Sequence, residues 1–135
     1  MDNKSLVKSH ERIRDLGEVF TPKSIVLLML KRLPEEFWKD PAKTLIDPSC
    51  GTGNFLVIII ALKIKMGSTP LQALSTTYGI DIAQDNIDEC KERMLLSAEK
   101  YSGLIREQSW IDVVNHNVIC GDGLKRETWE KFDEC

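Results

Sequence analysis

Three aspartates are expected at the edge of a parallel sheet where ligand-binding groups lie. Asp47, Asp81 and Asp122 each lie at or just after the end of a short apolar run that predicts a β-strand. In parallel α/β sheets, ligands bind outside the carboxyl ends of the strands. A carboxylate can accept two hydrogen bonds from the vicinal hydroxyls of a ribose, and Asp81 is the candidate for that role. The alternative is that Asp81 caps the helix that follows it.

The loop after Asp47 carries the glycines that a close backbone approach needs. The pair Leu45-Ile46 leads into Asp47, Pro48 breaks the strand, and residues 49–53 read Ser-Cys-Gly-Thr-Gly before an apolar segment. The pattern predicts a strand, a tight loop and a helix. Glycines admit a ligand that a Cβ would keep out, and a helix that begins near Asn54 favours an anionic or strongly polar group. We therefore expect this loop to cradle a small molecule.

Two common nucleotide loops are excluded by the residues that follow. A phosphate-gripping nucleoside-triphosphate loop needs Lys-Ser or Lys-Thr after its last glycine, and Asn54-Phe55 stand there instead. A dinucleotide loop needs a small residue three positions after its second glycine, and that position holds Leu56.

The run from Asp47 to Leu56 resembles the S-adenosylmethionine motif of DNA methyltransferases that methylate the exocyclic amino group of adenine. Ten consecutive positions fit the motif, whereas the alternative is a generic corner between a strand and a helix. The resemblance implies S-adenosylmethionine as the cofactor and DNA as the substrate of the completed enzyme. It also implies that catalysis consists of holding the attacking amine in line with the methyl group on the sulfonium, with no metal and no covalent enzyme intermediate.

A second motif in the same family order lies upstream. Residues 17–22 read Gly-Glu-Val-Phe-Thr-Pro, which resembles the segment that precedes the cofactor strand in the γ order of adenine methyltransferases. By that resemblance Phe20 packs on the methionine end of the cofactor and Thr21 reaches its carboxylate, although Thr21 alone is also a good helix N-cap. The resemblance further assigns Ile82 to the adenine ring and Asp122 to the adenine amino group. The cofactor-binding residues so predicted are Phe20, Thr21, Asp47, Ser49, Cys50, Gly51, Gly53, Asn54, Phe55, Asp81, Ile82 and Asp122.

The elements between these motifs predict an α/β fold. We expect a Rossmann-like methyltransferase half-fold with a short, mainly parallel sheet in the order 3-2-1 and helices on both faces. Residues 1–16 are predicted to form an amino-terminal helical arm, and residues 17–135 the S-adenosylmethionine-binding domain, ending at the start of the fourth strand. Strands are expected near residues 45–47, 77–80 and 117–120. Helices are expected at about 54–62, 71–75 (capped by Thr69), 84–100 and 105–115, with Ile87, Cys90, Met94, Ile105, Trp110, Ile111 and Val114 on their apolar faces.

One motif of the family is missing from this sequence. Adenine methyltransferases carry Asn-Pro-Pro-Tyr or a close variant after the fourth strand, where it holds the target amine and stacks on the flipped base. The sequence contains no Pro-Pro pair, so no catalytic residue is assigned. Without a fourth strand, the Leu45-Ile46 strand is expected to form an open edge that pairs with a second copy or a partner chain.

Composition narrows the remaining classes. The chain has 135 residues and a net charge of −3, which argues against a free-standing, non-specific nucleic-acid binder. No stretch approaches the roughly 20 apolar residues of a membrane span. The four cysteines form no Cys-x-x-Cys pair and the two histidines are isolated, so neither a metal site nor a disulfide framework is expected and a reducing cytoplasm is the natural setting.

Two functions stay open on the sequence. The first is the cofactor-binding part of an adenine-specific DNA methyltransferase that needs another polypeptide or a carboxyl-terminal part for activity. The second is a non-catalytic module, derived from such an enzyme, that senses or sequesters the cofactor. An unrelated nucleotide-binding α/β domain is a weaker third reading.

Overall fold

The structure is a computed structural model and describes residues 32–134. Residues 36–135 form one compact unit, so the predicted arm and its boundary at residue 17 lie outside the described residues. The described elements follow one another as α3 (Glu35–Lys39), β1 (Leu45–Asp47), α4 (Asn54–Lys65), α5 (Pro70–Ser75), β2 (Thr77–Asp81), α6 (Gln84–Ser102), α7 (Gln108–Asn117), β3 (Val118–Cys120), α8 (Arg126–Glu130) and the 3-10 helix η1 (Lys131–Asp133).

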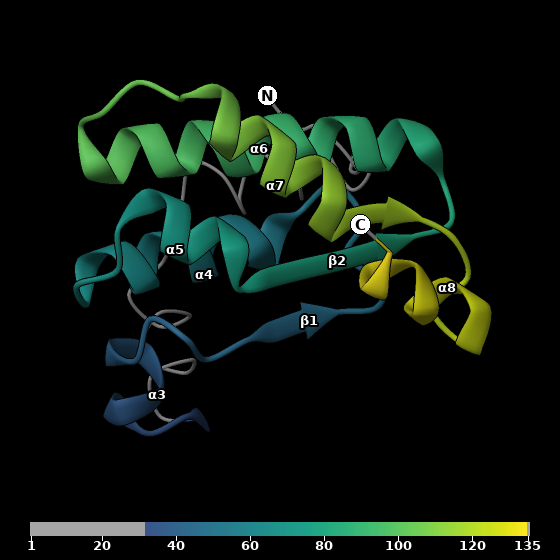
Figure 1. Cartoon of the computed structure of the whole chain (residues 1–135), viewed down its shortest axis with the longest axis horizontal. Coiled ribbons are helices and arrows are strands. Elements are labelled where there is room, and N and C mark those ends of the chain that lie inside the picture. Colours follow the sequence, from purple (N-terminus) through teal and green to yellow (C-terminus); the bar gives the residue numbers. More distant parts are fainter. Residues whose placement is uncertain (1–31, 135) are drawn as a thin grey trace, which may run out of the picture. The chain divides into compact units, whose positions relative to one another are not determined.

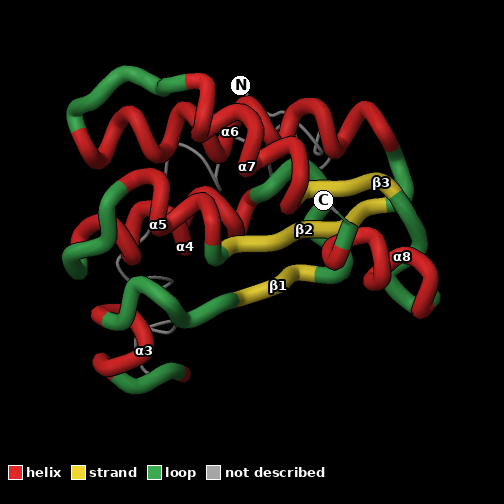
Figure 2. The backbone as a smooth tube through the Cα atoms, viewed as in Figure 1, coloured by secondary structure: helices red, strands yellow, loops and turns green. Residues whose placement is uncertain are grey.

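The three described strands form one parallel sheet with β2 in the middle (Figures 1 and 2). Ile46 is in register with Tyr78, and Ile80 is in register with Ile119. The predicted α/β class and the strand order 3-2-1 are therefore confirmed. Each connection runs through helices, as a parallel pair requires, because a tight turn cannot return the chain to the same end of the sheet.

Helices cover both faces of the sheet. α4 and α6 pack against each other and both contact β2. A Cβ on Gly79 would lie 2.8 Å from a methyl group of Leu56, so this position of β2 faces α4. Side chains alternate along a strand, which turns Tyr78 to the opposite face. There its ring meets Phe132 of η1 edge to face, with the centroids 5.1 Å apart.

The core is formed largely where the sequence pattern places it. Ile87, Cys90 and Met94 are fully buried on one face of α6, as their spacing predicts. Helix α5 begins as predicted, because the Thr69 hydroxyl accepts a hydrogen bond from Gln72 N and the Gln72 side chain accepts one from Thr69 N. The large side chains that are fully buried are Trp38, Leu56, Ile60, Leu74, Ile80, Ile87, Met94, Val114 and Val118.

A buried lysine joins the amino-terminal ends of β1 and β2. The Lys63 ammonium, on α4, donates to Lys43 O at 3.2 Å and to Thr76 O at 3.1 Å. It also donates to the hydroxyls of Thr76 and Thr77 at 2.6 and 3.2 Å. Burial lowers the pKa of Lys63 to about 8. These four acceptors compensate the ammonium for the water that it loses.

Two local predictions are wrong. The helix expected from Ile105 begins at Gln108, and Ile105 is 83% exposed instead of buried. The reason is Arg106, which donates to Glu92 and to Glu99 and so holds residues 103–107 as a loop along α6. Residues 131–133 are not the start of a strand but a 3-10 helix, which continues from α8 and packs Phe132 on Tyr78.

Within residues 32–134, no helix is both long enough and apolar enough to cross a membrane.

Candidate functional site

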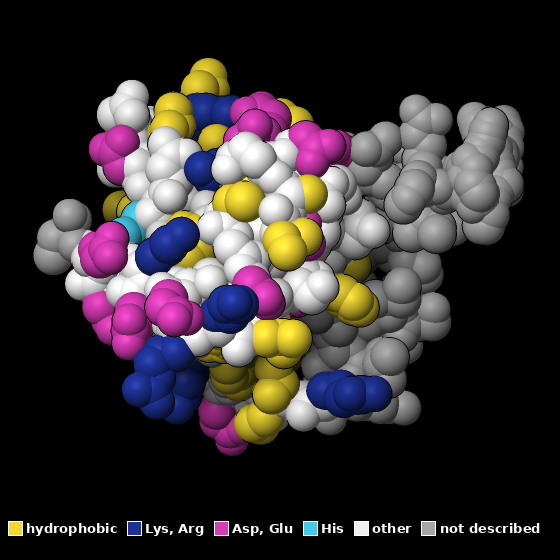
Figure 3. Space-filling model, turned by 90° about the vertical axis from the view of Figure 1, so that its right-hand side faces the viewer, with side chains coloured by type: hydrophobic (Ala, Val, Ile, Leu, Met, Phe, Trp, Pro, Cys, Tyr) yellow, Lys and Arg dark blue, Asp and Glu magenta, His cyan; other side chains and the backbone are white. Residues whose placement is uncertain are grey.

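The loops that follow β1, β2 and β3 enclose a cavity of about 440 Å³. This volume lies in the range of small-molecule sites. Figure 3 looks onto the side of the molecule toward which the strands point, where hydrophobic side chains lie among polar surface and charged groups of both signs. The cavity is lined by Pro48, Ser49, Asp81, Ile82, Gly121, Asp122, Gly123, Leu124 and Trp129.

Asp81 lies at the centre of this arrangement, at the last position of β2. Its Oδ1 accepts a hydrogen bond from Gly51 N at 3.1 Å. Its Oδ2 accepts one from Ala83 N at 3.1 Å and one from the Asn86 side chain at 3.0 Å. The carboxylate therefore joins the β1–α4 loop to the start of α6 and also lines the cavity. The alternative, that Asp81 caps this helix, is wrong: Ala83 is the N-cap residue of α6, and no side chain caps it.

The amides of the β1–α4 loop are mostly used within the protein. Ser49 N donates to Asp47 Oδ1 at 3.0 Å, Cys50 N to Ile80 O at 2.8 Å and Gly53 N to Cys50 O at 2.9 Å. Gly51 N is taken by Asp81. The expectation that these amides face a ligand is therefore wrong for the four residues. The N–H groups of the first turn of α4 have no partner within the helix, as at any helix start, and an anionic group would be favoured there.

The glycines of this region serve conformation and close packing. Gly51 and Gly53 have φ values of +57° and +92°, which L side chains rarely adopt. A Cβ on Gly53 would also lie 2.8 Å from Cys90 Sγ, so the loop sits directly on α6. A Cβ on Gly123 would clash with Pro48 O, so the loop after β3 contacts the loop after β1 across the end of β2.

A buried arginine that the sequence analysis missed supports the loop from behind. Arg93 of α6 is 6% exposed, and its Nη1 donates to Thr52 O at 2.9 Å and to Thr52 Oγ1 at 3.1 Å. The same nitrogen donates to Asn54 Oδ1 at 2.9 Å. The Asn54 amide oxygen is thus engaged with Arg93 and anchors the start of α4. The signal in the sequence was a charged residue at an otherwise apolar position of the helix, one residue before Met94.

The thiol of Cys50 is held neutral. Contact with the Cys90 thiol and burial both raise the pKa of Cys50 far above its ordinary value, and the carboxylates of Asp47 and Asp81 act in the same direction. A neutral, buried thiol is a poor nucleophile. Cys50 therefore serves packing between the loop and α6, and not covalent chemistry.

The mouth of the cavity has exposed apolar walls. Ile82 and Leu124 are 75% and 96% exposed, and Trp129 is partly exposed. Trp129 donates its indole N–H to Gly123 O at 2.7 Å, which fixes the β3 loop against α8. Asp122 uses Oδ1 to accept from Leu124 N at 2.9 Å, and Oδ2 carries no hydrogen bond in the described structure. An apolar slot with one available carboxylate oxygen suits a flat ring that bears an amino group.

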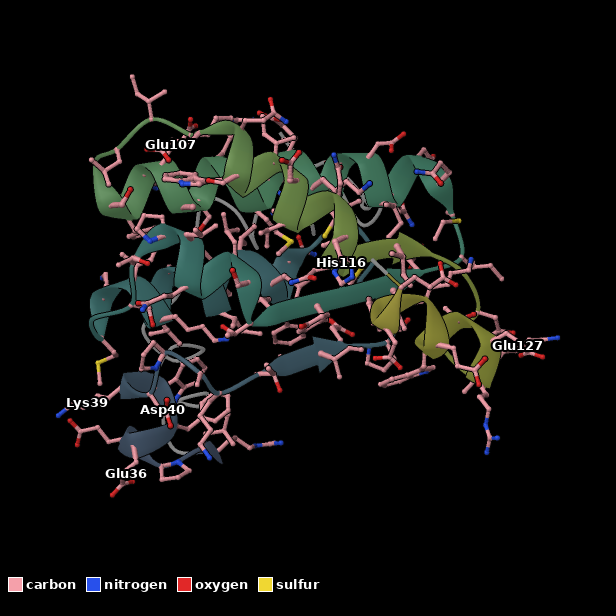
Figure 4. The ribbon with its side chains drawn as sticks, in the orientation of Figure 1. Glu36, Lys39, Asp40, Glu107, His116 and Glu127 are labelled. Carbon is pink, nitrogen blue, oxygen red and sulfur yellow. The ribbon has the colours of Figure 1, made fainter. Side chains whose placement is uncertain are left out.

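The charge of the lining has one sign. Among the described residues that line the cavity, Asp81 and Asp122 are the charged ones, and neither Lys nor Arg takes part. Other charged groups lie further out. Glu127 is on α8, whereas Glu36, Lys39 and Asp40 lie at and just after α3, near the other end of β1 (Figure 4). His116, at the end of α7, contacts Asn117 Oδ1 and Glu134 O and not the cavity.

The residues predicted for the site thus fall into three groups. Those that line the cavity are Ser49, Asp81, Ile82 and Asp122. Those that shape or flank the loop without lining the cavity are Asp47, Cys50, Gly51, Gly53, Asn54 and Phe55. Phe20 and Thr21 lie outside the described residues. The residues that line the cavity without having been predicted are Pro48, Gly121, Gly123, Leu124 and Trp129. Pro48 is next to the predicted Asp47 and Ser49, and Leu124 follows the Gly123 that comes after Asp122. Nothing in the sequence except its apolar character indicates that Trp129 lines the cavity.

Comparison with known proteins assigns the fold to a family. A model of the N-6 DNA methylase family matches residues 7–129. The chain belongs to the N-6 DNA methylase family. The match covers the three described strands and the cavity, so this family member contains a domain of the DNA adenine methyltransferase type. No curated protein and no solved structure matched the chain.

Proposed function

We propose that the cavity binds S-adenosylmethionine and that the domain is the cofactor-binding part of an adenine-specific DNA methyltransferase. The observation that carries the proposal is the lining, in which two carboxylates occur with no basic side chain among the described residues. Such a lining repels phosphate groups and attracts hydroxyls, amino groups and cations. S-adenosylmethionine has a ribose, an adenine amino group and a sulfonium, and it carries no phosphate.

The donor and acceptor set of the cavity fits this cofactor. Asp81 retains acceptor capacity on Oδ1 for a ribose hydroxyl, because each carboxylate oxygen has two lone pairs. Ile82 and Leu124 offer apolar contacts to the adenine ring, and Asp122 Oδ2 accepts from its amino group. When bound, the cofactor supplies an activated methyl group. Phe20 and Thr21 are proposed to hold its methionine end.

Methyl transfer also needs a site for the target base. The sequence holds no Asn-Pro-Pro-Tyr motif, and we propose that another polypeptide segment supplies it, with DNA as the substrate of the completed enzyme. The alternative is a non-catalytic module that binds the cofactor for regulation. Incubation of the purified chain with radiolabelled S-adenosylmethionine and DNA tests this point. Label transfer by the chain alone would exclude the non-catalytic alternative. It would also show that no second polypeptide segment is needed for methyl transfer.

The binding proposal is tested by calorimetric titration. We expect S-adenosylmethionine and S-adenosylhomocysteine to bind and ATP to bind far more weakly. Asp81→Asn removes the charge from the acceptor and should weaken S-adenosylmethionine binding about ten- to a hundred-fold. Asp88→Ala is the matched control, because Asp88 is an exposed carboxylate on α6 outside the cavity. ATP binding equal to that of S-adenosylmethionine, or no binding of either at millimolar concentration, would refute the proposal.

We also propose that the free edge of β1 takes up a strand of a second copy or of a partner chain. β1 pairs only with β2 among the described strands. Beside it runs a groove of about 490 Å³, whose wall includes Ile46, Tyr78 and Phe132. An unpaired edge with an apolar groove favours strand addition. Light scattering at tens of micromolar protein tests self-association. A monomeric mass there, together with no change on mixing with the chain that carries the target-base motif, would exclude both partners.

A further inference from the structure

Asn86 contacts Asp81, the proposed ribose acceptor, at the carboxylate oxygen that does not bind Gly51 N. It is the third residue of α6 and half-buried, and its Nδ2 donates to Asp81 Oδ2 at 3.0 Å. Its own backbone N–H donates to the neighbouring Asp85 carboxylate at 2.9 Å. The Asn86 side chain is not among the residues that line the cavity, so any effect on a ligand passes through Asp81.

The two oxygens of Asp81 are unequally occupied. Oδ2 accepts from Ala83 N and from Asn86 Nδ2, which fills both of its lone pairs. Oδ1 accepts only from Gly51 N among the described groups and keeps one lone pair. The free acceptor capacity of the carboxylate is thus concentrated on one atom. Three donors from two segments also fix the plane of the carboxylate, which lowers the entropy that a ligand must remove on binding.

We propose that Asn86 is a positioning residue for ribose recognition: by saturating Oδ2 and fixing the carboxylate, it leaves Asp81 Oδ1 as the acceptor for a ribose hydroxyl. This inference rests on the proposed cofactor site. Without Asn86, Oδ2 would have a free lone pair and the carboxylate would be held by backbone amides alone. The preference of the site for a ligand with ribose hydroxyls would then fall, because the acceptor would no longer be held in one orientation.

A purely structural role for Asn86 makes a different prediction. If the amide only ties Asp81 to the start of α6, its loss lowers the melting temperature and leaves ligand selectivity unchanged. Gln84 gives a matched control. It lies in the same turn, is exposed, and donates its side-chain amide to Asp88 at 2.9 Å, a bond of the same kind that does not involve Asp81. Gln84→Ala therefore measures the general effect of removing an amide from the start of α6.

The experiment compares two probes, adenosine and 2′,3′-dideoxyadenosine, by titration into the full chain and its variants. In the unaltered protein, adenosine should bind about ten- to a hundred-fold more tightly, since it alone offers the vicinal 2′ and 3′ hydroxyls to a charged acceptor. Asn86→Ala should reduce this ratio at least about threefold, whereas Gln84→Ala should leave it unchanged. Asn86→Asp, which keeps the shape but sets a carboxylate against Asp81, should reduce the ratio further.

Each result has a definite meaning. A ratio that stays the same in folded Asn86→Ala and Asn86→Asp overturns the positioning role while the cofactor site stands. Equal binding of both probes by the unaltered protein overturns ribose recognition by Asp81 and the positioning role with it. If neither probe binds at millimolar concentration, the cofactor site falls as well. Unfolding of both variants, with Gln84→Ala folded, would show that the amide serves stability and would also overturn the inference.

Discussion

Replacing Gly53 by alanine should reveal how tightly the β1–α4 loop is seated on α6. Two separate effects act at this position. The φ of +92° is unfavourable for an L side chain and costs about 1–2 kcal/mol. The new Cβ would also lie 2.8 Å from Cys90 Sγ in a packed interior, and overpacking of this kind costs about 1–3 kcal/mol. Gly53→Ala should therefore lower the free energy of unfolding by about 2–5 kcal/mol.

A double-mutant cycle separates the two effects. Cys90→Ala removes the sulfur atom but keeps a Cβ, which lies at an ordinary contact distance of 3.5 Å from the added methyl group. In that background Gly53→Ala should cost only the backbone strain of about 1–2 kcal/mol. Gly51→Ala is the control for strain alone, because its φ is +57° and no atom lies within 4 Å of a new Cβ.

Urea unfolding of the four members of the cycle and of the control gives these energies directly. The steric reasoning is refuted if Gly53→Ala costs as much in the Cys90→Ala background as in the unaltered protein. It is also refuted if Gly51→Ala proves as costly as Gly53→Ala, because strain alone would then account for both.

Three further perturbations follow from the described contacts. Lys63 has a pKa of about 8 in the folded chain against an ordinary 10.5, so between these values the unfolded state binds a proton that the folded state does not. The free energy of unfolding should therefore rise from pH 8 to 10.5 relative to that of Lys63→Met, measured by denaturant titration at each pH. If the free energies of the two proteins change in parallel with pH, Lys63 does not couple stability to pH. Arg93→Met removes the donor to Thr52 and Asn54 and should destabilise the fold by about 1.5–3 kcal/mol by urea unfolding; a loss below about 0.5 kcal/mol would contradict it. Arg106→Gln should weaken the protection of residues 103–107 in hydrogen exchange. Global stability should change little, because Glu92 is exposed and Arg106 and Glu99 are only partly buried; unchanged protection would contradict the role of Arg106 in holding this loop.

The strands, and the residues that their carboxyl ends bring to the cavity, could be predicted because local pattern and parallel topology agree. Asp81, Ile82 and Asp122 follow short strands, and a parallel sheet brings such positions to one edge whatever lies between them. The apolar spacing of Ile87, Cys90 and Met94 likewise suffices to orient α6, since burial of one face is what stabilises such a helix.

The failures come from side-chain and backbone contacts that the local sequence pattern does not report. The start of α7 depends on Arg106 meeting Glu92, which lies fourteen residues away, and no local propensity reports that pair. The use of the loop amides depends on where Ile80 and Asp81 stand beside the loop. Trp129 reaches the cavity because its indole bonds Gly123 O, a contact that exists only once α8 has folded back.

The unequal anchoring of the cavity has a consequence for how such a site can change over time. Asp81 is bound into the fold by three hydrogen bonds, so most substitutions there alter ligand affinity and stability together. Ile82 and Leu124 are largely exposed, and their side chains can be exchanged at little cost to the fold. New ligand preferences should therefore arise first through substitutions of Ile82 and Leu124, while Asp81 stays unchanged. A library for altered ligand selectivity is best randomised at Ile82 and Leu124, because substitutions there have little effect on folding.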